Sequence, residues 1–462
     1  MNVPIYRLFF VFLLLFAVLV GFTSRWAVFG QQRLRENPEN ARVRIEEQQI
    51  KRGVIRAANK EVLAGSTRLS GDRYGRRYPT GRLFALPVGF DDLRQGRQGL
   101  EKYYNDALVG RKEELSSLVD SLISEPQVGD DLQTTLVPRA QELAYDLLEG
   151  HKGAVVALGV RDGSVKVLAG TPSFNPNKPA EATSTFNLAT QGLYPPGSTM
   201  KTVTATAAID SGRYEPDSRV SGKNGKVISG TPLNNFSQQD YGDITLTEAL
   251  TNSVNTVWAE VGVKVGRNRM QEYMDRFGFG EDPPMDYPDE QMNASGPRDP
   301  KTGAIIPMSS DRVDVGRTAI GQALLLVTPL QMATVAQTIG NGGMRMEPRL
   351  VQRITDPEGR TVDEPMPEQA ERVMSQSSAN KVATMMRSVV REGSGTAAAL
   401  EGVEVAGKTG TAEINIEQGI NDLWFIGFTK DVAVAVIIER EQGQGGTVAA
   451  PIAKQVLQAL GQ

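Results

Sequence analysis

The sequence predicts an α+β fold, in which a five-stranded antiparallel sheet with flanking helices carries a helical insertion. Strand-like runs form a hairpin pattern over residues 153–169, and three more such runs follow over residues 403–439. The long interval between them is mostly helical in pattern, which indicates an insertion within one sheet domain. A charge-free run near the amino end adds a membrane anchor (1–30), followed by a stalk and pedestal domain (31–130) and the main domain (131–462).

Composition excludes several classes of function. Lys plus Arg total 50 and Asp plus Glu total 54, a formal net charge of −4, so no nucleic-acid partner is indicated. The absence of cysteine removes disulfides, thiolate chemistry and cysteine metal sites. His151 is the single histidine, so a Ser-His-Asp triad has one candidate and a multi-histidine metal site has none. Because His151 lies in a polar junction, we expect it on the surface.

The amino end carries fifteen uncharged residues, 8–22, which is slightly short for a membrane span and also fits the apolar part of a signal peptide. A buried core helix is a further alternative. No small-x-small cleavage site follows, and Trp26 stands where an interfacial aromatic residue belongs, so we favour an uncleaved anchor. Arginines on both sides leave the orientation open, and we expect the bulk of the chain outside the cytoplasm.

The region between the anchor and the main domain carries little recognisable chemistry. Residues 31–49 are polar and predict a stalk. Short β-like runs at 52–55 and 62–64 flank a turn, and helical patterns follow at 100–108 and 112–123. A spacer or docking role is therefore the default expectation.

The main domain opens with regular patterns. Residues 138–148 predict an amphipathic helix, and strands at 153–159 and 165–169 flank an Arg-Asp-Gly turn. The later elements are three strands, the last two joined by a short turn, and a closing helix that begins at a proline, over residues 403–406, 423–428, 432–439 and 451–460.

A Ser-x-x-Lys motif opens the first helix of the insertion. Two prolines and Gly197 precede Ser198, which we expect to be the helix N-cap. Lys201 then lies on the same face, about 5 to 6 Å away between Cβ atoms, where an amine can serve a nucleophilic hydroxyl as base. An N-cap serine before a solvated lysine is the plain alternative. A second such pair, Ser378 and Lys381, has neither a Pro-Gly entrance nor a buried helix pattern behind it.

Two more polar motifs follow in apolar surroundings. Ser253 and Asn255 flank a valine in a helical stretch, where polar groups need partners; a capped turn between two helices is the alternative. Lys408, Thr409, Gly410 and Thr411 come directly after the strand predicted at 403–406, and the glycines there let another backbone approach closely.

A competing motif overlaps the last one. Residues 402–409 match the phosphate-binding pattern G-x-x-x-x-G-K-T. Their middle residues alternate like a strand, the run continues extended to residue 413, and no apolar strand precedes residue 402. We therefore reject a nucleotide site, and we regard the Lys-Thr-Gly at 301–303 as chance.

Ser-x-x-Lys, Ser-x-Asn and Lys-Thr-Gly in this order make the chain resemble a penicillin-binding protein, a serine D,D-transpeptidase of the penicillin-recognising fold. The likeness covers about residues 131–462, and further stretches also resemble family signatures, at 173–177, 194–201, 328–333, 395–397, 406–413 and 424–428. The amino-terminal motifs of class B members resemble residues 52–55 together with Leu100, Glu101, Tyr104 and Asn105. The small pedestal is similar to that of penicillin-binding protein A. Two departures are Ala57-Ala58, where an acidic residue is usual, and Leu188 within Asn-Leu-Ala ahead of the serine motif.

The resemblance implies a role for each motif residue. Ser198 would be the nucleophile, Lys201 its base and Ser253 the proton relay, while Lys201 would need a pKa lowered by burial and by the charge of Lys408. Asn255 would hold the backbone amide of the substrate, which would lie as an added strand along residues 407–411, Gly410 included. Lys408, Thr409 and Thr411 would bind the terminal carboxylate, and the backbone N–H groups of Ser198 and Thr411 would form the oxyanion hole.

The function implied is peptidoglycan D,D-transpeptidation in cell-wall synthesis, for division or cell shape, through a serine acyl-enzyme and without metal or organic cofactor. Expected partners are stem peptides ending in D-Ala-D-Ala, β-lactam antibiotics, the membrane and a separate membrane glycosyltransferase, because residues before 131 are too few to hold one. A D,D-carboxypeptidase or a β-lactamase of the same fold is an alternative. A β-lactam sensor or an inactive cell-wall scaffold is the non-enzymatic alternative.

Overall fold

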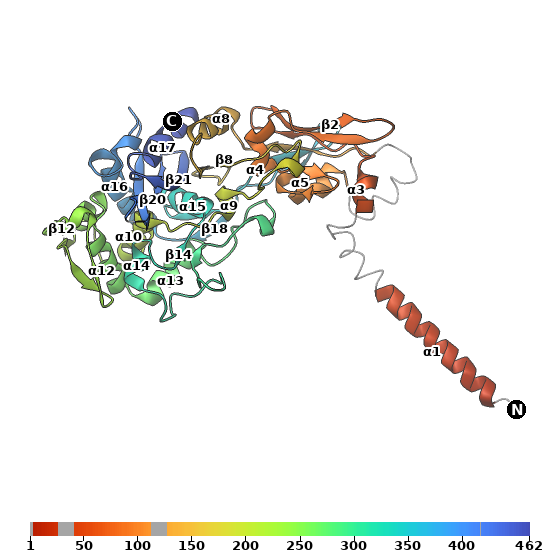
Figure 1. Ribbon diagram of the computed structural model, residues 1–462, viewed down its shortest axis with the longest axis horizontal. Coiled ribbons are helices and arrows are strands. Elements are labelled where there is room, and N and C mark those ends of the chain that lie inside the picture. Colours follow the sequence, from red (N-terminus) through yellow and green to blue (C-terminus); the bar gives the residue numbers. More distant parts are fainter. Residues whose placement is uncertain (1–2, 26–40, 112–126, 416) are drawn as a thin grey trace.

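The computed structural model describes residues 3–25, 41–111, 127–415 and 417–462. Helix α1, Val3–Arg25, lies apart from the folded body in Figure 1, and its apolar side chains are exposed. Within the described ranges it is the one helix long and apolar enough to cross a membrane. It extends the predicted run at both ends. Trp26, the interfacial aromatic that we predicted, lies outside the described residues.

The pedestal domain is built on a six-stranded sheet in the order β17-β16-β6-β1-β2-β3. The predicted turn is confirmed, because β1 pairs antiparallel with β2 and Ile55 stands opposite Ala64. Two strands, β16 and β17, arrive from the second half of the chain, so the sheet crosses the boundary that we expect near residue 130. The strands are β1 Ile55–Arg56, β2 Val62–Arg68, β3 Tyr74–Arg77, β6 Asp131–Thr134, β16 Val351–Thr355 and β17 Thr361–Asp363.

The predicted stalk is partly wrong. Residues Ala41–Glu47 form helix α3, and Glu47 is buried with ion pairs to Arg97 and Arg111, because a carboxylate with two guanidinium partners tolerates burial. The helix predicted at 100–108 is two helices, α5 Gly99–Tyr103 and α6 Asn105–Leu108, which meet at Tyr104. The helix predicted at 112–123 lies outside the described residues.

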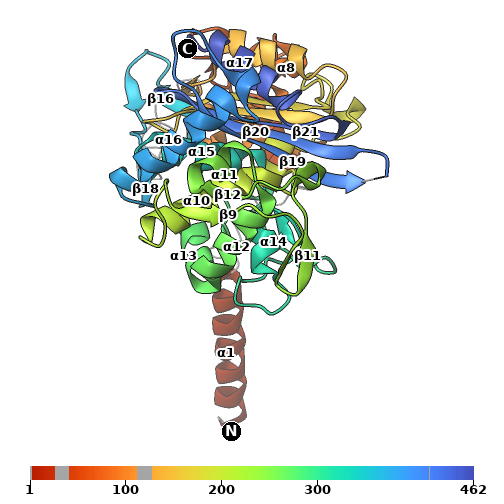
Figure 2. The ribbon, with the colours of Figure 1, turned by 90° about the vertical axis from the view of Figure 1, so that its left-hand side faces the viewer.

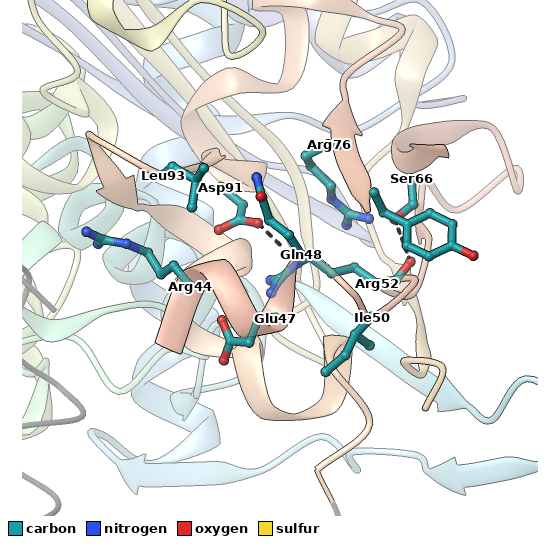
Figure 3. Close-up of a pocket in the computed structure, with 11 residues that line it drawn as sticks. Arg44, Glu47, Gln48, Ile50, Arg52, Ser66, Arg76, Asp91 and Leu93 are labelled. Carbon is teal, nitrogen blue, oxygen red and sulfur yellow. Dashed lines mark hydrogen bonds and ion pairs between the residues drawn. The ribbon is translucent and has the colours of Figure 1, made fainter. Parts of the chain in front are cut away.

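Buried charges join the pedestal elements. Glu101 is fully buried and accepts from Arg52 Nη2 at 2.9 Å and from Arg76 Nε at 2.5 Å. The adjoining cavity has a volume of about 50 Å³ and is lined partly by α3. Figure 3 shows Arg52 and Asp91 among its lining residues, and these two form an ion pair at 3.6 Å. The pedestal therefore depends on paired charges as well as on apolar packing.

The main domain is organised around a five-stranded antiparallel sheet in the order β19-β20-β21-β7-β8, as predicted. Both predicted hairpins are present. The strand predicted at 403–406 is wrong, because β19 begins only at Ala406 and runs through the Lys-Thr-Gly motif, where each residue has a partner on β20. The strands are β7 Gly153–Gly159, β8 Val165–Thr171, β19 Ala406–Asn415, β20 Ile420–Phe428 and β21 Val432–Gln442.

Helices cover both faces of this sheet (Figure 2). Along β7, Val155 and Ala157 pack with α8, Pro138–Leu147, and α17, Ala449–Ala459, whereas Ala154 and Val156 belong to the core shared with the insertion. Successive side chains of β7 therefore lie on opposite faces of the sheet and pack into two different hydrophobic cores. Helix α17 begins two residues before the predicted Pro451.

The insertion is mostly helical and also contains small two-stranded ladders. Its helices are α9 Leu188–Gln191, α10 Lys201–Asp210, α11 Leu246–Thr251, α12 Asn255–Val265, α13 Arg267–Arg276, α14 Val315–Ala319, α15 Pro329–Gly340 and α16 Gln376–Glu392. The ladders pair β9 Arg219–Ser221 with β12 Asp243–Thr245, β10 Lys226–Ile228 with β11 Thr231–Leu233, β13 Gly296–Pro297 with β14 Leu325–Leu326, and β15 Met344–Met346 with β18 Gln369–Arg372. The pedestal adds α4 Ala85–Val88 and the ladder of β4 Asp91–Asp92 with β5 Gly96–Arg97.

Candidate active site

Ser198 lies in a single 3₁₀ turn, Gly197–Met200, directly before α10. Our expectation of a helix N-cap is therefore wrong. The turn starts at Gly197 with φ +54°, and the Gly197 N–H donates to the carbonyl of Gly321 at 2.9 Å, which tightens the chain ahead of the helix. The partly exposed Ser198 hydroxyl makes no hydrogen bond with any residue that the structure describes.

Lys201 is the first residue of α10 and is fully buried. Its ammonium donates to the carbonyl of Ser253 at 2.7 Å, to the Ser253 hydroxyl at 3.1 Å and to Asn255 Oδ1 at 2.6 Å. The alternative of a solvated lysine is thereby excluded. The structure joins the first two motifs through this ammonium, and Ser198 is not yet hydrogen bonded to it, as is common in unliganded sites.

Ser253 lies between α11 and α12 in the left-handed region, with φ +56°. Such a conformation is unfavourable for a serine and persists only where the surroundings hold it. Lys408, on β19, also reaches this residue, because its Nζ donates to Ser253 Oγ at 3.0 Å and to the Thr409 carbonyl at 2.9 Å. Two buried ammonium groups therefore share one hydroxyl.

Burial changes the protonation of both lysines. Loss of solvation lowers the pKa of Lys201 well below 10.5, and the charge of Lys408 lowers it further. Burial lowers the pKa of Lys408 to about 7. Both effects favour the neutral amine of Lys201, which is the form that can accept a proton from a hydroxyl.

The two threonines of the third motif lie on β19, which is the outermost strand of its sheet. The Thr409 hydroxyl is 2.6 Å from the Ser394 hydroxyl, and Thr411 Oγ1 accepts from the Gly445 N–H at 3.2 Å. Because the Thr411 oxygen already accepts a backbone proton, its own proton is available for a ligand.

The serine turn packs directly against β19. A Cβ added at Gly410 would lie 2.8 Å from the carbonyl oxygen of Pro196, and one at Gly197 would lie 3.2 Å from the backbone of Thr411. Trp424, opposite Gly410 on β20, donates from Nε1 to the carbonyl of Pro195 at 3.0 Å. This packing places the backbone of the serine turn beside Thr411. The backbone N–H groups of Ser198 and Thr411 stay our prediction for the oxyanion hole.

Three polar contacts of the site escaped the sequence reasoning. Ser394 and Gly445 bind the hydroxyls of the third motif, and the Asn234 carbonyl accepts from Asn255 Nδ2 at 3.3 Å. All three lie outside the helices and strands, and each contacts a motif residue at least 15 positions away in the sequence. The one signal in the sequence close to any of them is the family-like stretch at 395–397, which directly follows Ser394.

The competing sequence motifs do not form sites. Lys408 and Thr409 of the G-x-x-x-x-G-K-T match lie inside β19, with no helix after them. Ser378 does lie in a helix with a buried face, contrary to our expectation, yet Lys381 pairs with Glu215 at the surface. His151 is partly exposed and contacts Glu441 at 3.0 Å. No group of three or more potential metal-ligating side chains occurs among the described residues.

One sequence departure has a structural account. Asn187 of the Asn-Leu-Ala stretch is buried and caps α9, where its side chain accepts from the Ala189 N–H at 3.1 Å. Leu188 and Ala189 then face the core. The stretch therefore has a structural role, as the cap of α9 and as part of the core.

Comparison with known proteins identifies the family. Residues 153–458, about two thirds of the chain, match the penicillin binding protein transpeptidase domain. The chain belongs to the penicillin-binding protein family. Residues 52–132 of this penicillin-binding protein match the penicillin binding protein A dimerisation domain, so the predicted likeness of the pedestal is confirmed.

Relatives resemble the chain along its whole length. It is 31% identical to the peptidoglycan D,D-transpeptidase PbpA of Mycolicibacterium smegmatis and 30% identical to that of Mycobacterium tuberculosis, with 99% of each chain covered. The structure of penicillin-binding protein A from M. tuberculosis as a ceftriaxone acyl-enzyme complex has a TM-score of 0.80 and 28% identity, and covers 90% of this chain and 100% of that one. A D,D-transpeptidase domain from Eggerthella lenta has a TM-score of 0.77 and 29% identity, over 89% of this chain and 98% of that one.

Proposed function

We propose that this penicillin-binding protein is a serine-type peptidoglycan D,D-transpeptidase, which cross-links stem peptides and which β-lactams inhibit. The observation that carries the proposal is the convergence of Lys201 and Lys408 on the Ser253 hydroxyl. Lys201 itself follows Ser198 by three residues, at the end of the serine turn. The mycobacterial relatives are peptidoglycan D,D-transpeptidases by name, which supports the reaction. The β-lactam acyl-enzyme structures of penicillin-binding protein A from M. tuberculosis support the chemistry.

Acylation begins at Ser198. Its oxygen attacks the carbonyl carbon of the penultimate D-Ala while its proton passes to the neutral amine of Lys201, which burial has made a suitable base. The N–H groups of Ser198 and Thr411 stabilise the oxyanion, each by about 3 to 4 kcal/mol. When the carbon–nitrogen bond breaks, Ser253 gives its hydroxyl proton to the leaving D-Ala and takes the proton held by Lys201, which becomes neutral again. Ser198 then carries the acyl group.

Substrate binding uses the outer edge of β19. The peptide adds to this strand along residues 407–411, and its terminal carboxylate meets Lys408, Thr409 and Thr411. The charge of that carboxylate favours the protonated form of Lys408, so binding itself helps to keep Lys201 neutral. Asn255 donates to the substrate backbone through the Nδ2 hydrogen that Asn234 does not use.

Transfer to an amine completes the reaction. The amine of a neighbouring stem peptide attacks the ester carbon, and Lys201 accepts the proton that this amine loses. Lys201 then gives that proton to the Ser198 oxygen, so Ser198 leaves as the free hydroxyl. With α1 as a single-pass anchor, we place the main domain on the outer side of the cell membrane, where peptidoglycan lies. A separate membrane glycosyltransferase as partner stays a prediction.

The test uses the full-length protein in detergent micelles with a donor peptide ending in D-Ala-D-Ala and an acceptor amine. Transpeptidation predicts D-Ala release together with a cross-linked product, and neither with Ser198→Ala. Release of D-Ala without cross-linked product at saturating acceptor would indicate a carboxypeptidase. Unchanged turnover by Ser198→Ala would refute the assigned nucleophile.

A further inference from the structure

The amide of Asn255 is held at both ends. Its Oδ1 accepts from Lys201 at 2.6 Å, and its Nδ2 donates to the backbone carbonyl of Asn234 at 3.3 Å. A flipped amide would turn its NH₂ group toward the ammonium and its oxygen toward a carbonyl, and both contacts would be repulsive. The Asn234 carbonyl therefore selects the orientation in which Asn255 can accept from Lys201.

The position of that carbonyl depends on the next residue. The buried Asn235 side chain donates from Nδ2 to the carbonyls of Gly222 and Gln239, both at 3.0 Å, and its Oδ1 accepts from the Thr256 N–H at 3.0 Å. Thr256 directly follows Asn255 in the first turn of α12. One amide thus fastens the segment 222–239 to the helix that carries Asn255.

The segment needs this fastening. Ser237 and Gln238 have φ values of +52° and +55°, a left-handed conformation that non-glycine residues adopt only when their surroundings impose it. The bond from Asn235 to the Gln239 carbonyl closes the turn across these two residues. Loss of the Asn235 amide would release the turn and, with it, the carbonyl of Asn234.

We propose that Asn235 is a positioning residue for catalysis, which fixes the orientation of Asn255 and so the hydrogen bonding of Lys201. This inference rests on the proposed function. Asn235 acts through Asn234 and Asn255, without contact with Ser198 or with the substrate. With two hydrogens of neutral Lys201 directed to the Ser253 carbonyl and to Asn255, the lone pair is left on the side of the Ser253 hydroxyl, 3.1 Å away, where it can accept a proton.

The variant Asn235→Asp tests this role. It keeps the acceptor for Thr256 and loses both donor bonds. The matched control is Asn224→Asp, which adds the same charge to the same segment. It keeps its hydrogen bond, because Asn224 Oδ1 accepts from the Asn235 N–H and an aspartate oxygen can do the same. Asn235→Ala adds no charge, and it gives the same comparison if the aspartate variant does not fold.

The ligand is 6-aminopenicillanic acid, which has no acylamino group for Asn255 to bind, and the protein is the full chain in detergent. We expect the first-order acylation constant to fall about tenfold in Asn235→Asp with little change in the dissociation constant, and the control to stay within about twofold. In an Asn255→Ala background, the same substitution should change the constant by less than about twofold.

Two results would overturn the inference. One is an unchanged acylation constant in folded Asn235→Asp and Asn235→Ala. The other is an equal loss in the Asn255→Ala background, because Asn235 would then act independently of Asn255. If the unsubstituted protein is not acylated at all, the proposed function fails first, and this inference fails with it.

Discussion

Lys201 and Lys408 donate to the same acceptor, the hydroxyl of Ser253, at 3.1 and 3.0 Å. Two buried ammonium groups at this separation repel each other strongly, so the pair favours states in which at least one amine is neutral. The arrangement couples the base near Ser198 to the lysine that we expect at the substrate carboxylate. The protonation of one lysine therefore depends on the other.

The first prediction concerns the pH dependence of acylation. Lys408→Met removes the charge that lowers the pKa of Lys201, so that pKa rises and less neutral base exists at pH 7. The acid limb of the acylation rate should move to higher pH, with a loss of about tenfold or more at pH 7. Lys408→Arg, which keeps the charge, should leave the limb nearly in place. A limb that moves to lower pH in Lys408→Met would contradict the coupling.

The second prediction concerns stability. The pKa of Lys408 falls from 10.5 to about 7 in the folded protein, so between these values the unfolded chain binds more protons. The charged lysine therefore costs stability at pH 7, by at most roughly 5 kcal/mol, and this cost disappears as the pH rises toward 10. Lys408→Met should raise the free energy of unfolding at pH 7 by about 1 to 3 kcal/mol, since it also loses two hydrogen bonds.

Urea unfolding of the full chain at pH 7 and pH 9.5 measures this effect. The advantage of Lys408→Met should shrink at the higher pH, whereas the exposed control Lys301→Met should show no pH-dependent difference. A constant advantage at both values would mean that the charge of Lys408 is not destabilising.

The third prediction concerns the pedestal. Glu101→Gln leaves the guanidinium groups of Arg52 and Arg76 without their shared buried carboxylate. Breaking a buried ion pair in this way should lower the free energy of unfolding of the pedestal by about 3 to 5 kcal/mol. The control is Glu404→Gln, which removes an exposed partner of Arg387. It should change the free energy of unfolding by less than about 1 kcal/mol. Similar unfolding curves for both variants would show that the buried network is not stabilising.

The fourth prediction concerns the serine turn. Gly321 has φ +76°, and a Cβ there would lie 2.0 Å from the Gly197 carbonyl oxygen, so Gly321→Ala should displace the turn of Ser198. We expect acylation by penicillin to slow by about a hundredfold. Gly303→Ala is the control, because Gly303 has φ +72° but an added Cβ meets no atom within 4 Å. Equal acylation rates in the two variants would show that the turn tolerates the displacement.

Local patterns in the sequence predicted much of the fold. The hairpin of β7 and β8 follows from apolar runs around one turn, and α8 follows from its helical periodicity. Only the start of the Lys-Thr-Gly strand is misplaced, because its glycines weaken any strand pattern. The extended run expected to residue 413 is present, and pairing with β20 continues it to Asn415. Similarly, Ser198 has the composition of an N-cap, but Gly197 and its bond to Gly321 impose a 3₁₀ turn.

Contacts between distant segments were beyond sequence reasoning. No local signal places β16 beside β6 in the pedestal sheet, since the two strands are more than two hundred residues apart. The same holds for Ser394 beside Thr409 and for Asn235 beside Thr256. The motif residues themselves were found because their types and order resemble a family, and the structure then brought Lys201, Ser253, Asn255 and Lys408 together.

The most direct test of the central claim is intact-mass spectrometry of the full-length protein in detergent after incubation with benzylpenicillin. We predict a mass increase of one penicillin on the unsubstituted protein, stable over the measurement, and none on Ser198→Ala. An unmodified protein with intact drug would contradict the claim that Ser198 is an activated nucleophile. An adduct that persists on Ser198→Ala would place the nucleophile elsewhere.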